Sequence, residues 1–161
     1  MTYLIHFKER PIKIGQGFNQ GTHRKWPEDR EDFTYSTDFL LRQGTKIIAA
    51  REGVVTKVKI NGDKNYAGKN PLHGEEYYKD HTNEVEIKHS DGTFSCYAHL
   101  KYRSVKVKVG QYAKQGQPIA LSGNTGWSSQ PHLDFSVYNR NVQNWKIKSI
   151  KFKFTNYLKK L

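Results

Sequence analysis

The chain has 161 residues, 35% of them hydrophobic, and its 27 Lys and Arg against 15 Asp and Glu give a formal net charge of +12. This length suits one domain with a core of its own, so we expect a single domain over residues 1–161. No run of about 18 apolar residues occurs, which argues against a transmembrane helix, and His6 and Lys8 break the apolar patch that a signal peptide would need. The single cysteine, Cys96, excludes an internal disulfide and is expected to be a buried structural thiol.

The positive charge is concentrated in the second half of the chain. Residues 92–161 carry twelve Lys and Arg and one acidic residue, Asp134, whereas residues 1–91 are nearly balanced. Such a surface attracts anionic partners, although the alternating Lys of SVKVKVG and WKIKSIKFKF is also typical of strands with one solvated face. A carboxylate as isolated as Asp134 is expected to have a specific partner.

Strand signals dominate the chain, and helical periodicity is almost absent. The first 37 residues are expected to be irregular, with the turn-rich segment GQGFNQGTHRKWPEDRED (15–32) as a loop over one end of a sheet. Residues 61–82 are expected to form a long surface loop. Gly and Asp-Gly pairs mark turns between short alternating runs, a pattern that predicts an all-β fold, either a sandwich or an open barrel. The predicted strands are residues 46–50, 53–60, 83–90, 93–100, 105–110, 117–123 and 133–139, with one more in the last 20 residues.

Two of the seven histidines stand at the ends of predicted strands. His99 ends TFSCYAHL, and His132 follows the Gly-rich turn SGNTGWSSQP. A sheet fixes the backbone at such positions while the adjoining loop gives access, which makes them natural places for a site. One such histidine alone would be expected to be structural, but several His and Asp at strand ends favour a functional cluster.

Five motifs follow one another along the chain: STDF (36–39), GTKIIAAREGVV (44–55), YAHL (97–100), VKVGQYAKQGQPIALSGNTGWSS (107–129) and PHLDF (131–135). This ordered set resembles the lysostaphin/LytM-type zinc metalloendopeptidases, which cut peptide bonds in bacterial peptidoglycan. The resemblance covers about residues 15–138 and implies an open, antiparallel β-sheet fold with a groove whose floor holds one zinc. Residues 139–161 would add a basic strand and tail, and the family implies a bacterial cell envelope or secreted location.

The family pattern is only partly conserved in its site residues. The resemblance implies that His99 and His132 are the two catalytic histidines and that Asp38 is a metal ligand. Two further ligand positions, both histidine in the family, are occupied here by Thr34 and Asp134.

An Asp oxygen is a good ligand for a divalent metal, whereas a neutral hydroxyl is a poor one. We therefore expect Asp134 to be a ligand and Thr34 not to be. His23, in the loop QGTHRKW, is expected to supply the missing ligand, with His81 as a weaker substitute.

The metal expected is one zinc ion, but two carboxylates and one histidine also suit harder ions such as manganese or calcium, and a site that binds no metal is the alternative. With metal, the protein is expected to be an endopeptidase acting on peptidoglycan peptides. Without metal, the same groove would bind peptidoglycan or a protein without cutting it.

Four aromatic side chains are candidates for substrate binding: Tyr66, Tyr77 and Tyr78 in the long loop, and Trp127 in the turn before His132. Packing within their loops is the alternative for each. Nucleic acid is not expected as a partner, because no aromatic-rich nucleic-acid motif is present. The expected partners are peptidoglycan or a related peptide, with an anionic cell-wall polymer as a further option, and the chain is expected to be a monomer.

Overall fold

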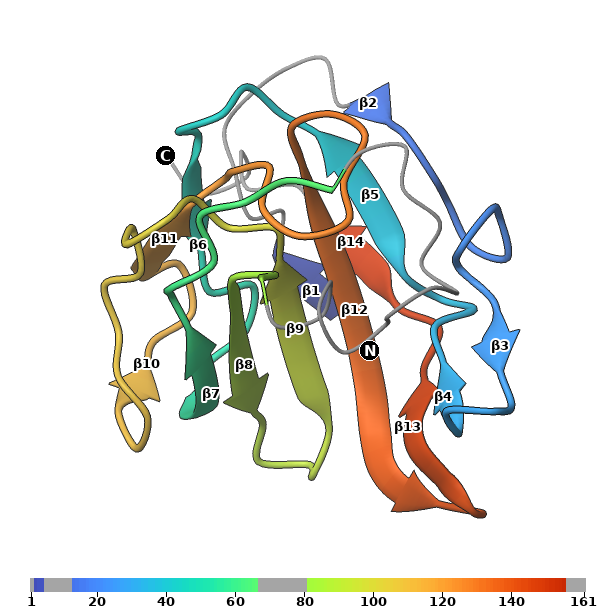
Figure 1. Ribbon diagram of the computed structural model, residues 1–161. Helices are drawn as coiled ribbons and strands as arrows, with labels where there is room; N and C mark the ends of the chain where they lie inside the picture. Colours follow the sequence, from blue (N-terminus) through green and yellow to red (C-terminus); the bar gives the residue numbers. More distant parts are fainter. Residues whose placement is uncertain (1, 5–12, 67–80, 156–161) are drawn as a thin grey trace.

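The computed structural model describes residues 2–4, 13–66 and 81–155 (Figure 1). Every regular element within these residues is a β-strand, which confirms the predicted all-β class. None of the described segments forms a helix of the length and apolarity needed to cross a membrane. The strands arrange as one large sheet and two small two-stranded sheets.

The large sheet has ten strands, and most neighbours are antiparallel. Its main path runs β10-β7-β8-β9-β12-β13-β4-β3, and β5 pairs with both β12 and β2. The strands are β2 (Lys13–Ile14), β3 (Lys25–Trp26), β4 (Glu31–Asp32), β5 (Thr37–Leu40), β7 (Gly53–Lys59), β8 (Glu84–Lys88), β9 (Phe94–Ala98), β10 (Tyr112–Ala113), β12 (His132–Val142) and β13 (Trp145–Ser149).

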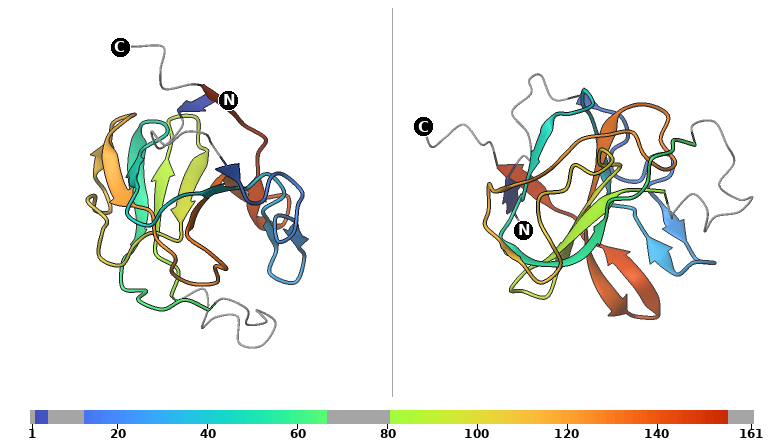
Figure 2. Two further views of the ribbon diagram at one scale, coloured as in Figure 1. Left: turned by 90° about the horizontal axis from the view of Figure 1, so that it is seen from above. Right: turned by 60° about the vertical axis from the view of Figure 1, so that its left-hand side comes forward.

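Two small sheets complete the fold. β6 (Lys46–Ile48) and β11 (Pro118–Leu121) pair antiparallel, and β1 (Thr2–Leu4) and β14 (Lys153–Thr155) pair in parallel. Figure 2 shows that the β1–β14 pair lies behind the large sheet, on the side away from the viewer of Figure 1.

The long strand β12 determines where the site forms. β9 pairs with it on one side, while on the other side β5 pairs with its beginning and β13 with its end. This register places Asp134 opposite Asp38 of β5 and, on the other side, opposite Ala98 of β9. Two carboxylates therefore stand side by side on adjacent strands, with His99 immediately after β9.

Alternation along β12 separates the core from the groove face. Leu133, Phe135 and Val137 are fully buried, whereas Asp134 and the other even-numbered residues of this segment face the opposite side. Successive side chains of a strand point to opposite faces, so the same eleven residues build both surfaces.

Both ends of the chain contribute to the aromatic core behind β12. The ring centroid of Phe135 lies 5.8 Å from that of Tyr3, 5.2 Å from that of Phe152 and 5.7 Å from that of Phe154. Tyr3 and Phe152 are 0% and 4% exposed, and each such burial contributes about 2–3 kcal/mol relative to an exposed side chain. The buried core thus includes residues outside the 15–138 segment that carries the family resemblance.

Several expectations about local structure are confirmed. The hairpin between β8 and β9 turns at Gly92, whose φ of +83° suits a residue without a Cβ. Cys96 is a free thiol and 8% exposed, and burial raises its pKa well above the usual value. These features followed from short-range pattern alone.

Other expectations about local structure were wrong. Residues 105–110 form no strand, because an alternating run becomes one only when it pairs continuously with a neighbour. Their backbone makes separate bonds instead, including Lys106 N–H to Ile119 C=O and Gly110 N–H to Val55 C=O, both at 2.8 Å. The first 37 residues are not all loop: they contain β1, β2, β3 and β4. The sheets are not wholly antiparallel, because β1 pairs in parallel with β14, and β13 pairs in parallel with β4.

Of the predicted loop 61–82, residues 67–80 lie outside the described part of the chain.

Candidate metal centre

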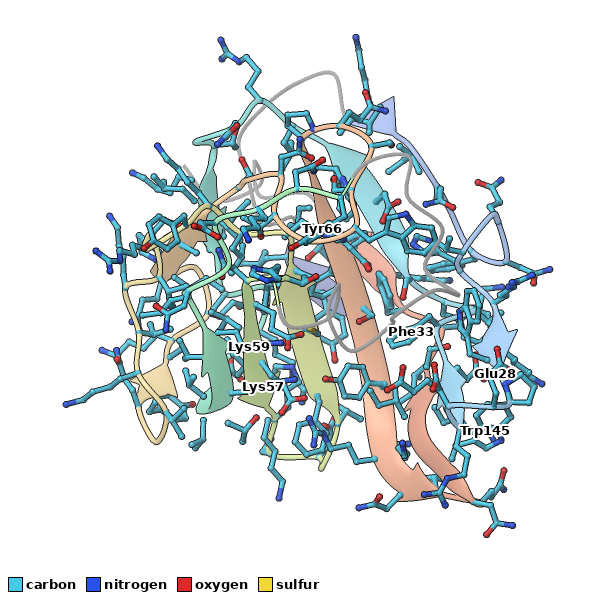
Figure 3. The ribbon with its side chains drawn as sticks, in the orientation of Figure 1. Glu28, Phe33, Lys57, Lys59, Tyr66 and Trp145 are labelled. Carbon is cyan, nitrogen blue, oxygen red and sulfur yellow. The ribbon has the colours of Figure 1, made fainter. Side chains whose placement is uncertain are left out.

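A groove of about 630 Å³ crosses the face of the large sheet that carries Asp134. Strands β8, β9 and β12 form its floor. Lys57 and Lys59 of β7 line one side, and Trp26 and Phe33, from the β3–β4 region, line the other. Figure 3 shows the two lysines and Phe33 on opposite sides of this face.

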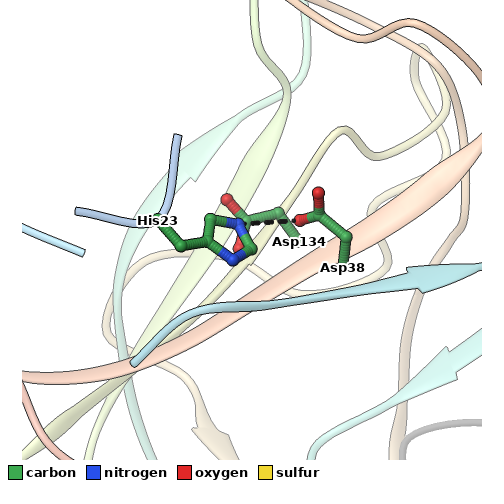
Figure 4. Close-up of side chains that lie close together, drawn as sticks. All are labelled: His23, Asp38 and Asp134. Carbon is green, nitrogen blue, oxygen red and sulfur yellow. Dashed lines mark ion pairs between the residues drawn. The ribbon is translucent and has the colours of Figure 1, made fainter. Parts of the chain in front are cut away.

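Three side chains in the groove form a compact donor cluster, His23, Asp38 and Asp134 (Figure 4). One potential ligand atom from each residue lies within 4.8 Å of the others. His23 Nε2 is 3.1 Å from Asp38 Oδ1. Asp38 and Asp134 come from paired strands, whereas the loop between β2 and β3 brings in His23.

The loop orients the His23 ring through its other nitrogen. His23 Nδ1 lies 3.0 Å from the Gly17 carbonyl oxygen, so the ring donates its Nδ1–H there and directs Nε2 toward the carboxylates. Metal-binding histidines commonly donate their second N–H to a backbone carbonyl in this way. His23 is 3% exposed, which leaves its ring little freedom to turn.

Both carboxylates present an oxygen that a cation would satisfy. Asp134 Oδ1 is buried and accepts no hydrogen bond within the described part of the chain, whereas the buried Asp38 Oδ1 lies in ion pairs with His23 Nε2 (3.1 Å) and His132 Nε2 (3.8 Å). A buried carboxylate oxygen without a hydrogen bond is costly, and a bound divalent cation would remove that cost. Donor type, spacing and these two oxygens therefore fit a metal ion.

The charges of the cluster are strongly coupled. Burial opposes protonation of His23, but contact with Asp38 and the charge of Asp134 outweigh it and raise the pKa of His23 to about 9. Burial, reinforced by the charge of Asp38, raises the pKa of Asp134 to about 7. For Asp38, burial is outweighed by contact with His23 and by the charge of His132, so its pKa is lowered. These pKa values favour a protonated His23 beside an ionised Asp38 at pH 7.

Two further histidines, His99 and His132, stand beside the cluster with their ring centroids 4.4 Å apart. His99 Nδ1 is 2.7 Å from the carbonyl oxygen of Thr125, and His132 Nδ1 is 2.8 Å from that of Gln130. Each ring donates its Nδ1–H to a carbonyl, which leaves Nε2 as a proton acceptor. His132 Nε2 lies 3.8 Å from Asp38 Oδ1.

The backbone of His99 is held in an unusual conformation, with a φ of +60°. This left-handed region costs a non-glycine residue about 1 kcal/mol, and such strain is concentrated at functional sites. Burial, and then the charge of His132, lower the pKa of His99 to about 4, so this ring is neutral at pH 7 and can accept a proton.

The structure separates the two candidates for the missing ligand. His23 lies in one cluster with the two carboxylates. His81 does not line the groove, and its ring centroid lies 5.4 Å from that of Tyr66. Thr34 is also absent from the groove lining, and its carbonyl oxygen accepts a hydrogen bond from the Asn19 N–H (2.7 Å).

The four aromatic candidates have different positions. Trp127 lines the groove beside His132. Tyr66 is 4% exposed and does not line the groove, so the expectation that its ring stacks on a ligand was wrong: it packs within its loop. Tyr77 and Tyr78 lie outside the described residues.

Sequence reasoning did not single out Gln16 and Ser128, two polar residues that contact the site residues. Gln16 Nε2 donates to Asp38 Oδ2 (2.7 Å), and Ser128 Oγ is 2.9 Å from His132 Nδ1. No local signal identifies them, because Gln16 reaches Asp38 only through the pairing of β2 with β5.

This β-sheet groove, with its His and Asp donors and two adjacent histidines, has the architecture of a metallopeptidase. The chain belongs to peptidase family M23, whose sequence pattern matches residues 32–146. This assignment confirms the resemblance noted in the sequence. His23 precedes the matched segment.

Three related proteins illustrate the likeness. Lysostaphin of Staphylococcus simulans is 34% identical over 121 residues, covering 74% of this chain and 18% of that protein. The structure of its catalytic domain superposes with a TM-score of 0.56 at 26% identity, covering 86% of this chain and 88% of the domain. Peptidoglycan DD-endopeptidase ShyA of Vibrio cholerae is 34% identical over 104 residues, covering 65% of this chain and 20% of that protein.

The structure of a zinc-containing peptidase from Vibrio cholerae superposes with a TM-score of 0.58 at 28% identity, covering 91% of this chain and 38% of the other. Together these likenesses confirm the lysostaphin-type fold. The chain spans less than a third of the length of the curated relatives it matches, 18% to 28% for the first four.

Proposed function

We propose that this chain is a metal-dependent endopeptidase acting on peptides of bacterial peptidoglycan, with His23, Asp38 and Asp134 as the metal ligands. The observation that carries the proposal is the convergence of these three donors, with Asp134 Oδ1 buried and accepting no hydrogen bond within the described residues. The substrate class is supported by the relatives, one of which is a peptidoglycan DD-endopeptidase.

The donor set suits one divalent metal. Zinc is supported by the related zinc-containing peptidase, and one imidazole with two carboxylates also suits manganese or calcium. Two carboxylates and a neutral His23 would balance the charge of a dication. Bound there, the metal would supply Lewis-acid chemistry that makes water more acidic and polarises a peptide carbonyl.

The proton transfers of peptide hydrolysis would fall to His99 and His132. Their Nε2 atoms are proton acceptors beside the cluster, and hydrogen bonds from Nδ1 to the carbonyls of Thr125 and Gln130 fix both rings. One or both would take a proton from the attacking water and return it to the leaving amine. Trp127 would contact the substrate in the groove, and Tyr77 and Tyr78 remain predicted contacts.

A second candidate is a binding module that does not hydrolyse its ligand. It is favoured by the departures at Thr34 and Asp134 from the family pattern, and by the His23–Asp38 ion pair, which partly neutralises the cluster without a metal. The same groove would then hold a peptidoglycan peptide uncut.

Digestion of purified peptidoglycan fragments distinguishes these functions. The protein is incubated with zinc, with manganese or with a chelator, and the products are analysed by liquid chromatography and mass spectrometry. Metal-dependent release of new amino and carboxyl termini is the expected result. Binding of the fragments with no cleavage under any metal condition would favour the binding module.

Metal affinity should rise with pH, because the metal must displace protons from the cluster. The pKa of Asp134 is raised to about 7 and that of His23 to about 9. Affinity should therefore climb about tenfold per pH unit between these values, more steeply below them, and level off above. Titration of zinc against a chromophoric chelator from pH 6 to pH 9 measures this, and a flat profile would contradict the protonation scheme.

A further inference from the structure

Gln16 contacts both segments that bring the proposed ligands together. Its side-chain Nε2 donates to Asp38 Oδ2 (2.7 Å), and its Oε1 accepts a hydrogen bond from the Thr22 backbone N–H (3.0 Å). Thr22 directly precedes His23. A single amide therefore joins β5 to the loop that carries the histidine.

The contact with Asp38 selects which carboxylate oxygen faces the cluster. Because the Gln16 amide donates a hydrogen bond to Oδ2, Oδ1 is the oxygen that faces the cluster, at 3.1 Å from His23 Nε2. The backbone fixes this arrangement further, because Asp38 N–H donates to the Gln16 carbonyl and Gly15 N–H to the Asp38 carbonyl, both at 2.9 Å. Gln16 cannot shift without disturbing the strand pairing beside Asp38.

The contact with the loop is equally close. Gly21 has a φ of +53°, and a Cβ at this position would lie 1.9 Å from Gln16 Oε1. The turn that leads into His23 thus packs directly on the amide, at a distance that only glycine permits. Loss of the amide would remove the side-chain contact that ties this turn to Asp38 of β5.

We propose that Gln16 is a positioning residue that fixes His23 and Asp38 relative to one another and so sets the affinity of the cluster for metal. The effect on metal rests on the proposed function, whereas the effect on the loop does not. Gln16 lies outside the matched segment 32–146, as does His23.

The test compares Gln16→Met, which keeps the length and removes both hydrogen bonds, with Gln20→Ala. Gln20 is a matched control because it lies in the same loop and its side chain binds only the Gly17 N–H (2.7 Å) among the described contacts. Gln16→Met should bind zinc about 10–100-fold more weakly and alter the absorption spectrum of bound Co²⁺, whereas Gln20→Ala should stay within about twofold of wild type. Zinc affinity within about twofold for Gln16→Met would overturn the proposal.

Hydrogen exchange of the metal-free proteins gives an independent result. The Thr22 amide, whose N–H donates to Gln16 Oε1, should exchange faster in Gln16→Met and not in Gln20→Ala, and unchanged exchange of this amide would overturn the proposal. If the wild type binds no metal, the proposed function fails and exchange alone decides the role of Gln16. Gln16→Asn is a milder variant for use if Gln16→Met does not fold: its amide is one methylene too short to reach both partners, so the same faster exchange is expected.

Discussion

Replacing His23 with alanine is expected to weaken zinc or manganese binding by at least about 100-fold, because it removes the only nitrogen donor of the cluster. Asp38 and Asp134 would remain, and two carboxylates on neighbouring strands repel each other without a cation between them. Isothermal titration calorimetry, with competition by a chelator for the tighter complexes, measures the change.

His81→Ala is the matched control for His23→Ala. His81 was the other histidine considered for the missing ligand, and it lies away from the groove against Tyr66. Its replacement should leave metal affinity within about twofold of wild type. Wild-type affinity in His23→Ala, or a large loss in His81→Ala, would remove His23 from the proposed ligand set.

The second large effect is expected on turnover. Replacing His99 or His132 with alanine should lower kcat by about 10²–10⁴-fold, the usual contribution of a positioned general acid or base. Metal content should not change, because neither ring belongs to the donor cluster. The measurements are steady-state cleavage of a peptidoglycan-derived peptide and elemental analysis of the same preparations.

Ser129→Ala is a suitable control for these variants, since Ser129 lines the groove in the loop before His132 and is exposed. Its kcat should stay within about twofold of wild type. If His99→Ala and His132→Ala kept full turnover, proton transfer would have to be assigned to other groups. If they lost metal, the two rings would belong to the metal site.

The strand register explains why much of the site could be predicted from the sequence. Asp38 and Asp134 each lie in a motif on a strand, and the pairing of β5 with β12 brings them opposite each other. His99 and His132 occupy strand ends, where sequence position and spatial position are closely related. His23 was a candidate because of its chemistry, and the structure places it beside both carboxylates.

The remainder depends on contacts that the local sequence does not encode. Gln16 meets Asp38 only because β2 pairs with β5, and residues 13–14 are too short a strand to be recognised from pattern. Tyr66 was expected at the groove because of its residue type, but it is 4% exposed and its ring centroid lies 5.4 Å from that of His81. Residues 105–110 alternate as a strand does, yet no neighbouring strand pairs with them among the described residues.

This chain has Asp134 where the family pattern has a histidine. The replacement changes the charge of the cluster as well as its ligand chemistry. With a neutral His23, the two carboxylates match the charge of a dication, and they favour harder metals than two imidazoles and one carboxylate would. Metal identity is thus the property in which this chain is most expected to depart from the pattern of its family.

Elemental mass spectrometry of the protein, purified without chelator or added metal, would show whether His23, Asp38 and Asp134 hold a metal ion. About one equivalent of a divalent transition metal per chain, zinc or manganese, is expected. A protein that contains no metal, and takes up none after incubation with excess zinc and then manganese, would show that these residues do not form a metal site and would leave the groove as a binding site alone.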